Sequence, residues 1–235
     1  MQINGAVALV TGGNRGLGEK FVQALLDGGA AKVYAAARNP ASVTVPGAVP
    51  LALEITDPES VRAAAEAAGD VTLLINNAGA SNGVDLLTSE MDVVRNEFET
   101  HVFGTLAVSR AFAPVLARNG GGAVLNVLSA LSWFTTPGSA VYSAAKSAEW
   151  SLTNATRLAL HGQGTLVTGL HVGYMDTDMA AGVDAPKSDP AKIARIALDG
   201  VEAGLYEVLA DDTSRQVKAG LAADPSALYA ELAAR

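Results

Sequence analysis

A serine, a tyrosine and a lysine stand at a spacing suited to proton transfer at a carbonyl oxygen. Ser129 ends an apolar run, and the segment Tyr142-Ser-Ala-Ala-Lys146 begins thirteen residues later. Residues four positions apart share one face of a helix. An ammonium group beside a phenol favours the phenolate, so Lys146 is expected to lower the pKa of Tyr142 from its ordinary value of about 10. Tyr142 is therefore a candidate general acid and base, and Ser129 can hydrogen-bond the same oxygen.

A glycine-rich turn follows the first apolar run of the chain. The run Ala6–Thr11 leads into Gly12-Gly-Asn-Arg-Gly-Leu-Gly18, after which a helical pattern begins. Glycines let the backbone approach a pyrophosphate closely, and the N-terminus of a helix favours its negative charge. A tight turn without a ligand is the alternative, and the strand–loop–helix setting favours the nucleotide. The residues expected to bind it here are Gly12, Asn14, Arg15, Gly16, Leu17 and Gly18.

Two arginines indicate which dinucleotide is preferred. Arg15 lies inside the glycine turn, and Arg38 follows the second apolar run, Lys32–Ala37. An acidic residue at the end of that strand would bind a ribose 2′-hydroxyl, whereas an arginine pairs with a 2′-phosphate. Both arginines could instead be solvated surface charges. Their two positions favour NADP(H) over NAD(H) as the cofactor.

Taken together, these motifs resemble those of the short-chain dehydrogenase/reductase family, in its compact single-domain form. The similarity runs through residues 6–222 and includes the glycine turn, the Asn-Asn-Ala-Gly segment at residues 76–79, Ser129 and the Tyr-x-x-x-Lys pair. The resemblance implies that Tyr142 exchanges a proton with the substrate oxygen and that Ser129 orients that oxygen. It also implies that Lys146 acidifies Tyr142 and holds the nicotinamide ribose.

The resemblance implies further contacts along the cofactor. Glu54 and Ile55 stand where the family has an Asp and an aliphatic residue at the adenine, and Asn76 is expected to tie neighbouring strands together. Val172 replaces the proline of the family's Pro-Gly-x-x-x-Thr loop, in which Thr177 would meet the nicotinamide carboxamide. The implied cofactor contacts beyond the glycine turn are Arg38, Glu54, Ile55, Asn77, Ala78, Gly79, Tyr142, Lys146, Gly173, Met175 and Thr177.

A histidine departs from the family pattern. His101-Val-Phe-Gly104 stands where the family has Asn-x-x-Gly, and that Asn is the fourth member of the family's catalytic set. Its main-chain carbonyl holds a water that relays protons to the lysine. A histidine keeps the carbonyl and adds a titratable ring. Either the backbone does the work and the side chain is tolerated, or the relay is altered and the activity reduced. We favour retained activity, with His101 as a catalytic candidate, because Ser129, Tyr142 and Lys146 are all present.

The elements that must position these residues alternate along the chain. Apolar runs without polar alternation, each followed by a helical pattern, indicate a parallel sheet covered on both faces. The fold class is therefore α/β, a single-domain Rossmann-type doubly wound sheet of about seven strands spanning residues 1–235. The expected strands are Ala6–Thr11, Lys32–Ala37, Val49–Leu53, Val71–Asn76, Ala123–Ser129, Leu166–Val172 and Glu207–Ala210. The expected helices are Gly16–Gly29, Pro58–Ala68 with Asp57 as its N-cap, Glu90–Arg118 with a bend near Gly104 or Pro114, Ser139–His161, Pro190–Ala203 and Thr213–Ala222.

Composition excludes several classes of protein and site. The chain has no cysteine, which rules out disulfides, zinc–thiolate sites and a thiol nucleophile, and its histidines lack metal-ligand spacing. The net charge of −8 argues against nucleic acid and anionic membranes as partners. With no apolar run long enough to span a membrane and no signal-peptide pattern, the expected location is the cytoplasm.

The expected partner is a small carbonyl or alcohol substrate, and the family resemblance implies a homodimer or homotetramer. Trp133, Phe134, Tyr174 and Met179 either line a substrate pocket or pack in the core, and residues 179–188 are either a lid or a plain loop. The first hypothesis is an NADPH-dependent carbonyl reductase or secondary-alcohol dehydrogenase. The alternatives are an NADP(H)-binding regulator with weak or no turnover, and an isomerase or dehydratase on the same fold.

Overall fold

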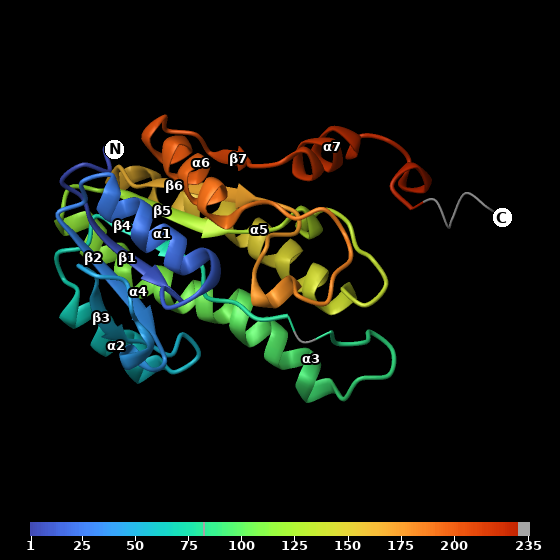
Figure 1. Ribbon diagram of the computed structural model, residues 1–235, viewed down its shortest axis with the longest axis horizontal. Helices are drawn as coiled ribbons and strands as arrows, with labels where there is room; N and C mark the ends of the chain where they lie inside the picture. Colours follow the sequence, from blue (N-terminus) through green and yellow to red (C-terminus); the bar gives the residue numbers. More distant parts are fainter. Residues whose placement is uncertain (82, 230–235) are drawn as a thin grey trace.

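Seven parallel strands form one sheet at the centre of the protein (Figure 1), in a computed structural model that describes residues 1–81 and 83–229. The order across the sheet is β3-β2-β1-β4-β5-β6-β7. The strands are β1 (Val7–Thr11), β2 (Lys32–Ala37), β3 (Val49–Ala52), β4 (Leu73–Asn76), β5 (Ala123–Val127), β6 (Leu166–His171) and β7 (Glu207–Leu209). The predicted α/β class and doubly wound parallel sheet are confirmed. The end of the predicted domain at residue 235 lies outside the described residues.

Helices cover both faces of this sheet. The helices α1 (Gly16–Asp27) and α6 (Pro190–Glu202) pack against each other and enclose one apolar core with the sheet. A second core lies on the other face, where α2 (Pro58–Ala67) packs on α4 (Thr105–Arg118) and α5 (Ala140–Leu160) packs on β6. The strand order reverses between β1 and β4, and ligands bind such sheets beyond the carboxyl ends of the strands at this reversal.

The helix predicted over residues 90–118 is three consecutive segments. It begins as α3 (Met91–Phe98), continues as a π-helical stretch over Glu99–Gly104, and ends as α4, which contains Pro114. π-Helical turns inside α-helices are often found at functional sites. Here the wider turn carries His101 into the protein interior, where the side chain is 1% exposed.

Several predicted ends differ from the structure by one to three residues. Strand pairing ends earlier than predicted on β5, because the chain turns into a short 3₁₀ segment that Ser129 caps. The predicted N-terminus of α2 is confirmed, since the Asp57 carboxylate accepts a hydrogen bond from the Glu59 N–H and Pro58 is the first helical residue. The last helix, α7 (Asp212–Gly220), begins one residue earlier than predicted because Asp211 caps it.

Asn76, predicted to tie strands together, does so in the core. Its side-chain amide donates to Asn126 Oδ1 of β5 at 2.8 Å and to Ser109 Oγ of α4 at 3.0 Å. Buried polar groups of this kind are stabilising only when they are paired. No helix of residues 1–81 and 83–229 is long and apolar enough to cross a membrane.

Candidate active site

A cleft of about 930 Å³ opens at the carboxyl ends of the strands, and it brings every predicted site residue together. Its walls are formed by the glycine turn, the ends of β2, β4, β5 and β6, and the start of α5. The predicted residues that line it are Gly12, Asn14, Arg15, Gly16, Leu17, Gly18, Arg38, Glu54, Ile55, Asn77, Ala78, Gly79, His101, Ser129, Tyr142, Lys146, Gly173, Met175 and Thr177.

The glycine turn is shaped for a close ligand. Gly12 and Gly16 have φ values of +65° and +55°, which residues with a side chain rarely adopt. A β-carbon at Gly18 would overlap the carbonyl oxygen of Gly12, so only glycine fits there. No side chain caps the N-terminus of α1, at Arg15. The first-turn N–H groups of α1 are thus suited to an anion, as a pyrophosphate would be.

Residues of β1 and β4 hold this turn in place. The Thr11 hydroxyl accepts hydrogen bonds from the backbone N–H groups of Asn77 and Ala78, both at 2.9 Å. The Asn77 side chain donates in turn to the carbonyls of Thr11 at 2.9 Å and Gly12 at 3.3 Å. The two sides of the strand reversal are therefore linked by hydrogen bonds around the place where a nucleotide would lie.

Both predicted arginines line the cleft, with their side chains largely exposed. The Arg15 guanidinium is 3.6 Å from the Asp178 carboxylate, and the Arg38 Nε is 3.9 Å from that of Glu54. Their side chains are 70% and 81% exposed, so these contacts are weak and can be exchanged for a ligand. Nearby, the Asn14 side chain donates to the Ser42 hydroxyl at 3.1 Å.

The predicted adenine pair splits into two roles. Glu54 folds back on its own loop, where its carboxylate accepts hydrogen bonds from the Thr56 N–H and hydroxyl at 3.1 and 2.9 Å. Ile55 is buried and packs so closely on Gly104 that a β-carbon there would come within 2.8 Å of its Cδ1. A glycine is therefore required at position 104, where the π-helical turn contacts the loop after β3.

Ser129 is held rigidly at the end of β5. It caps a 3₁₀ segment over Ala130–Ser132, and its Oγ accepts from the Leu131 N–H at 3.1 Å. The same hydroxyl lies 3.5 Å from the Val172 carbonyl. The hydroxyl group also interacts with Tyr142, where hydrogen bonding favours the phenolate. Ser129 and Tyr142 thus meet as predicted.

As predicted, Lys146 acts to lower the pKa of Tyr142. Other groups, however, determine the direction of the net pKa shift. Burial raises the pKa of Tyr142 above 10, Lys146 opposes this increase, and the Glu149 carboxylate adds to it. The expectation of a lowered pKa is therefore wrong, because burial and Glu149 outweigh the effect of the lysine. The phenol is held in its protonated form, as a proton donor requires.

Lys146 is fixed by two partners inside the protein. Its Nζ donates to the Val127 carbonyl at 2.8 Å and to Glu149 Oε2 at 2.6 Å. Although burial lowers the pKa of Lys146, Glu149 and Tyr142 more than offset this, and the pKa lies above its ordinary value. The ammonium lies 5.8 Å from the centre of the Tyr142 ring, so its charge acts on the phenol across a short distance.

His101 packs directly on Tyr142. The two rings meet edge to face at 88°, with centres 5.1 Å apart. The Nε2 of His101 lies 2.6 Å from the Ala80 carbonyl, to which it donates, and the ring fills the space beside Gly79. The side chain therefore supports both Tyr142 and the loop after β4, as well as leaving the backbone carbonyl in place.

Two buried glutamates were not predicted as site residues. Glu149, which is 2% exposed, binds Lys146 and accepts a hydrogen bond from the Thr105 hydroxyl at 3.1 Å. Glu97, which is 1% exposed, lies 3.5 Å from His101 Nε2. The spacing carries a signal that could have found them: Glu149 is three residues after Lys146, and Glu97 is four before His101, so each pair shares a helix face.

The candidate substrate residues separate into three that line the cleft and one that packs elsewhere. Phe134, Tyr174 and Met179 line the cleft, whereas Trp133 turns away and stacks on His171 with ring centres 3.8 Å apart. The loop over residues 179–188 is anchored at its base, where Ser188 N–H donates to the Tyr174 carbonyl at 2.8 Å. Among the described residues, no group of three or more His, Asp or Glu side chains is placed to hold a metal ion.

Comparisons with known proteins agree with this geometry. The sequence model of the short chain dehydrogenases matches residues 6–188. A short chain dehydrogenase from Burkholderia cenocepacia J2315, solved in complex with NADP, superimposes with a TM-score of 0.93 at 40% identity, covering 99% of both chains. The 1-deoxy-11-beta-hydroxypentalenate dehydrogenase of Streptomyces exfoliatus is 31% identical over 90% of this chain and 82% of its own. Carbonyl reductase [NADPH] 2 of Sus scrofa is 32% identical over 68% of each chain.

Proposed function

The chain belongs to the short-chain dehydrogenase family, and from this premise we propose that it is an NADPH-dependent carbonyl reductase or secondary-alcohol dehydrogenase. One observation carries the proposal: Ser129, Tyr142 and Lys146 line the same cleft as the glycine turn. A proton donor therefore lies beside a place built for a dinucleotide. The proposed domain is one unit that both binds the nucleotide and catalyses the reaction, spanning residues 1–235.

The residues present fit a dinucleotide. The positive φ values of Gly12 and Gly16, and the space at Gly18 that a β-carbon would fill, form a cradle at the uncapped N-terminus of α1. We propose that the pyrophosphate binds there and that Asn77, Ala78 and Gly79 follow the nucleotide towards Tyr142 and Lys146. Glu54 and Ile55 would lie at the adenine, and Gly173, Met175 and Thr177 near the nicotinamide. The bound cofactor would supply or accept the hydride.

NADP(H) is the proposed form because the adenosine end carries exposed positive charge. Arg15 and Arg38 are the two guanidinium groups of the cleft, and neither is committed to a short ion pair. A 2′-phosphate could bind both of them and the Ser42 hydroxyl without removing a buried charge from its partner. The NADP complex of the similar Burkholderia protein supports the same choice.

The proton transfer follows from the geometry of the chain's own side chains. In reduction, the carbonyl carbon gains a hydride and the carbonyl oxygen takes the proton from the Tyr142 hydroxyl, which forms an alcohol and leaves a phenolate. Ser129 would donate a hydrogen bond to the same oxygen and hold it in reach. Lys146 stabilises the phenolate by its charge, and His101 packs the ring in position. In oxidation the proton returns by the same path.

The substrate side of the cleft favours a neutral carbonyl compound with apolar substituents. Its wall includes Leu131, Phe134, Tyr174, Met179 and Val183. Of the cationic groups of the cleft, Lys146 is buried against Glu149, and Arg15 faces Asp178, the residue before Met179. These five wall residues themselves offer no positive charge to a substrate carboxylate or phosphate.

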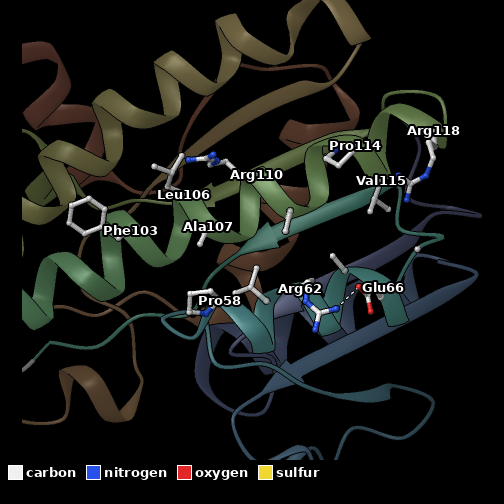
Figure 2. Close-up of a pocket in the computed structure, with 14 residues that line it drawn as sticks. Pro58, Arg62, Glu66, Phe103, Leu106, Ala107, Arg110, Pro114, Val115 and Arg118 are labelled. Carbon is white, nitrogen blue, oxygen red and sulfur yellow. Dashed lines mark hydrogen bonds and ion pairs between the residues drawn. The ribbon is translucent and has the colours of Figure 1, made fainter.

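We further propose a homodimer or homotetramer in the cytoplasm. An apolar groove of about 640 Å³ runs between α2 and α4, with Pro58 on one side and Phe103 and Ala107 on the other (Figure 2). Phe103 is 53% exposed, and Leu158 of α5 is 80% exposed. Apolar surface of this kind is typical of an interface between copies of a chain. Sedimentation of the wild-type protein and of a Phe103→Lys variant tests the oligomer.

A reductase screen tests the proposed function. NADPH and NADH oxidation are followed by absorbance with a panel of ketones and aldehydes, neutral and acidic. We expect oxidation of NADPH with neutral carbonyl compounds and slower oxidation of NADH. Tight binding of NADPH without oxidation on any substrate would instead support the regulator, the alternative suggested by His101.

A further inference from the structure

A cluster of buried ionisable side chains surrounds the proton donor, and it contains two carboxyl groups and one amino group. Lys146 is the one buried lysine among residues 1–81 and 83–229, whereas two glutamates, Glu97 and Glu149, are buried beside it. All three residues are at most 5% exposed, so water screens their charges poorly. The three side chains come from α3 and α5, two helices that pack on each other.

Glu149 is held on both of its oxygens. Oε2 accepts from Lys146 Nζ at 2.6 Å, and Oε1 accepts from the Thr105 hydroxyl at 3.1 Å. The Lys146 ammonium in turn donates to the Val127 carbonyl at the end of β5. This chain of contacts connects α4, α5 and β5, and it fixes the lysine in one position. Because the partner of Lys146 is a carboxylate, it also sets the net charge near Tyr142.

We propose that Glu149 is a positioning residue that fixes the Lys146 ammonium against the Val127 carbonyl and, as a carboxylate in direct contact with that ammonium, sets the pH at which the Tyr142–Lys146 pair loses its first proton. This inference rests on the proposed function, in which Tyr142 is the proton donor.

The pH at which Tyr142 and Lys146 lose protons depends on the titratable groups that face them. Tyr142, Lys146 and Glu149 come from α5, Glu97 from α3 and His101 from the π-helical turn. On β6, burial and the nearby charge of Lys146 lower the pKa of His171. Burial raises the pKa of Tyr142, and both glutamates add to this increase. Burial lowers the pKa of Lys146, and the two glutamates oppose it. Each carboxylate therefore makes both groups harder to deprotonate.

The sign of a glutamate substitution follows from this arrangement. The pair starts as neutral phenol and ammonium, and it loses a first proton as the pH rises. Whichever group loses that proton, removal of a nearby negative charge makes the loss easier. Neutralising Glu149 thus moves the first deprotonation of the pair to lower pH, by about one pH unit for a charge in direct contact.

The test compares Glu149→Gln with Glu149→Asp and with Glu202→Gln. Glu202 is a matched control, because its carboxylate accepts a hydrogen bond from the Ile3 N–H at 2.8 Å and lies outside the cleft. Reductive kcat/KM is measured against pH. We expect the alkaline limb to move down by about one unit in Glu149→Gln. We expect it to return to within a few tenths of the wild-type value in Glu149→Asp, which keeps the charge, and not to move in Glu202→Gln. The proposal is overturned if the alkaline limb of kcat/KM lies at the same pH in Glu149→Gln and in the wild type.

A second measurement needs no turnover. Tyrosine labelled with ¹³C at Cζ reports phenol ionisation by NMR, and comparison with Tyr142→Phe assigns one signal among the five tyrosines. At the highest pH at which both proteins remain folded, we expect Tyr142 to be more ionised in Glu149→Gln than in wild type. Equal ionisation refutes the role of Glu149. An inactive wild type that shows the expected difference refutes the proposed function alone. Should Glu149→Gln not fold, we expect Glu97→Gln to increase the ionisation of Tyr142 by a smaller amount. Unchanged ionisation of Tyr142 in Glu97→Gln would then refute the proposal.

Discussion

The two ends of the cleft carry charge in opposite ways. At the end proposed for the adenosine, Arg15 and Arg38 are 70% and 81% exposed and have only loose carboxylate contacts. At the catalytic end, Lys146, Glu149 and Glu97 are at most 5% exposed. Exposed charges can be exchanged between partners at little cost, which suits the capture of a soluble ligand. Buried charges keep a fixed field at the reacting atoms, which suits catalysis.

This difference predicts that substitutions at one end change the rate of the chemical step, whereas substitutions at the other end change the affinity for the cofactor. Changes at the catalytic end should lower the rate of the chemical step while cofactor affinity is kept. Changes at the adenosine end should weaken or redirect cofactor binding while the chemical step remains intact in the saturated enzyme.

The largest effect is expected at the proton donor. Tyr142→Phe removes the hydroxyl and keeps the ring that packs against His101. We expect kcat to fall by about 1,000-fold, the typical contribution of a general acid, while the Kd for NADPH changes by less than about threefold. Steady-state kinetics and a fluorescence titration with NADPH measure the two quantities. Full activity in Tyr142→Phe would remove the tyrosine from the mechanism.

The next effect is expected in the glycine turn. In Gly18→Ala the added β-carbon overlaps the carbonyl oxygen of Gly12, so the turn must move. We expect the affinity for NADPH to fall by about 100-fold, in line with the cost of overpacking a tight site. Gly162→Ala is the matched control, since a β-carbon there meets no atom within 4 Å. Equal NADPH affinity in both variants would mean that the turn does not bind the cofactor.

A smaller effect is expected for the choice of cofactor. Arg38→Asp replaces a possible phosphate partner by a residue that repels phosphate and accepts from a ribose hydroxyl. We expect the ratio of kcat/KM for NADPH to that for NADH to fall by about 30-fold, the size expected for loss of one charged hydrogen bond. The same ratio in Arg195→Asp, a change at an exposed residue of α6, should stay constant. An unchanged ratio in Arg38→Asp would undo the argument for NADP(H).

The smallest effect is expected on the free energy of unfolding, through the buried His171 of β6. Burial lowers the pKa of His171 to about 4, so the unfolded chain, with a pKa near 6.5, takes up the proton more readily than the folded protein. The stability contribution is complete above a pH of about 6.5 and is lost as the pH falls towards about 4. Between about pH 7 and pH 5 we expect this group to lower the free energy of unfolding by about 2 kcal/mol.

Chemical denaturation at both pH values checks this loss. It should be absent from His171→Gln and retained in His161→Gln, which changes an exposed histidine. A loss of the same size in His171→Gln would assign the pH dependence to other groups.

The geometry of the glycine turn could be predicted from sequence more fully than the surroundings of Tyr142. The glycine turn is contiguous, and its φ values and helix start follow from local residue types, so Gly12 to Gly18 were found directly. Tyr142 and Lys146 were likewise found because four residues make one helical turn. The direction of the pKa shift at Tyr142 was missed, because it depends on desolvation and on Glu97, which is brought close only when α3 packs on α5.

Side-chain direction outside regular elements was also beyond sequence reasoning. Trp133 and Phe134 are neighbours in a turn, yet Phe134 lines the cleft and Trp133 stacks on His171. No periodicity distinguishes them, since the preceding 3₁₀ segment ends at Ser132 and the backbone then follows the turn. The π-helical stretch at Glu99–Gly104 was anticipated only as a bend, because its wider turn depends on the burial of His101 and the contact of Gly104 with Ile55.

Transfer of a labelled hydride tests the central claim most directly. The protein is incubated with NADPH deuterated at nicotinamide C4 and with a neutral ketone, and the products are analysed by mass spectrometry. The account predicts one deuterium on the carbinol carbon of the alcohol for each NADPH oxidised, with the transfer lost in Tyr142→Phe. Binding of NADPH at the glycine turn with no labelled alcohol from any carbonyl compound would contradict it.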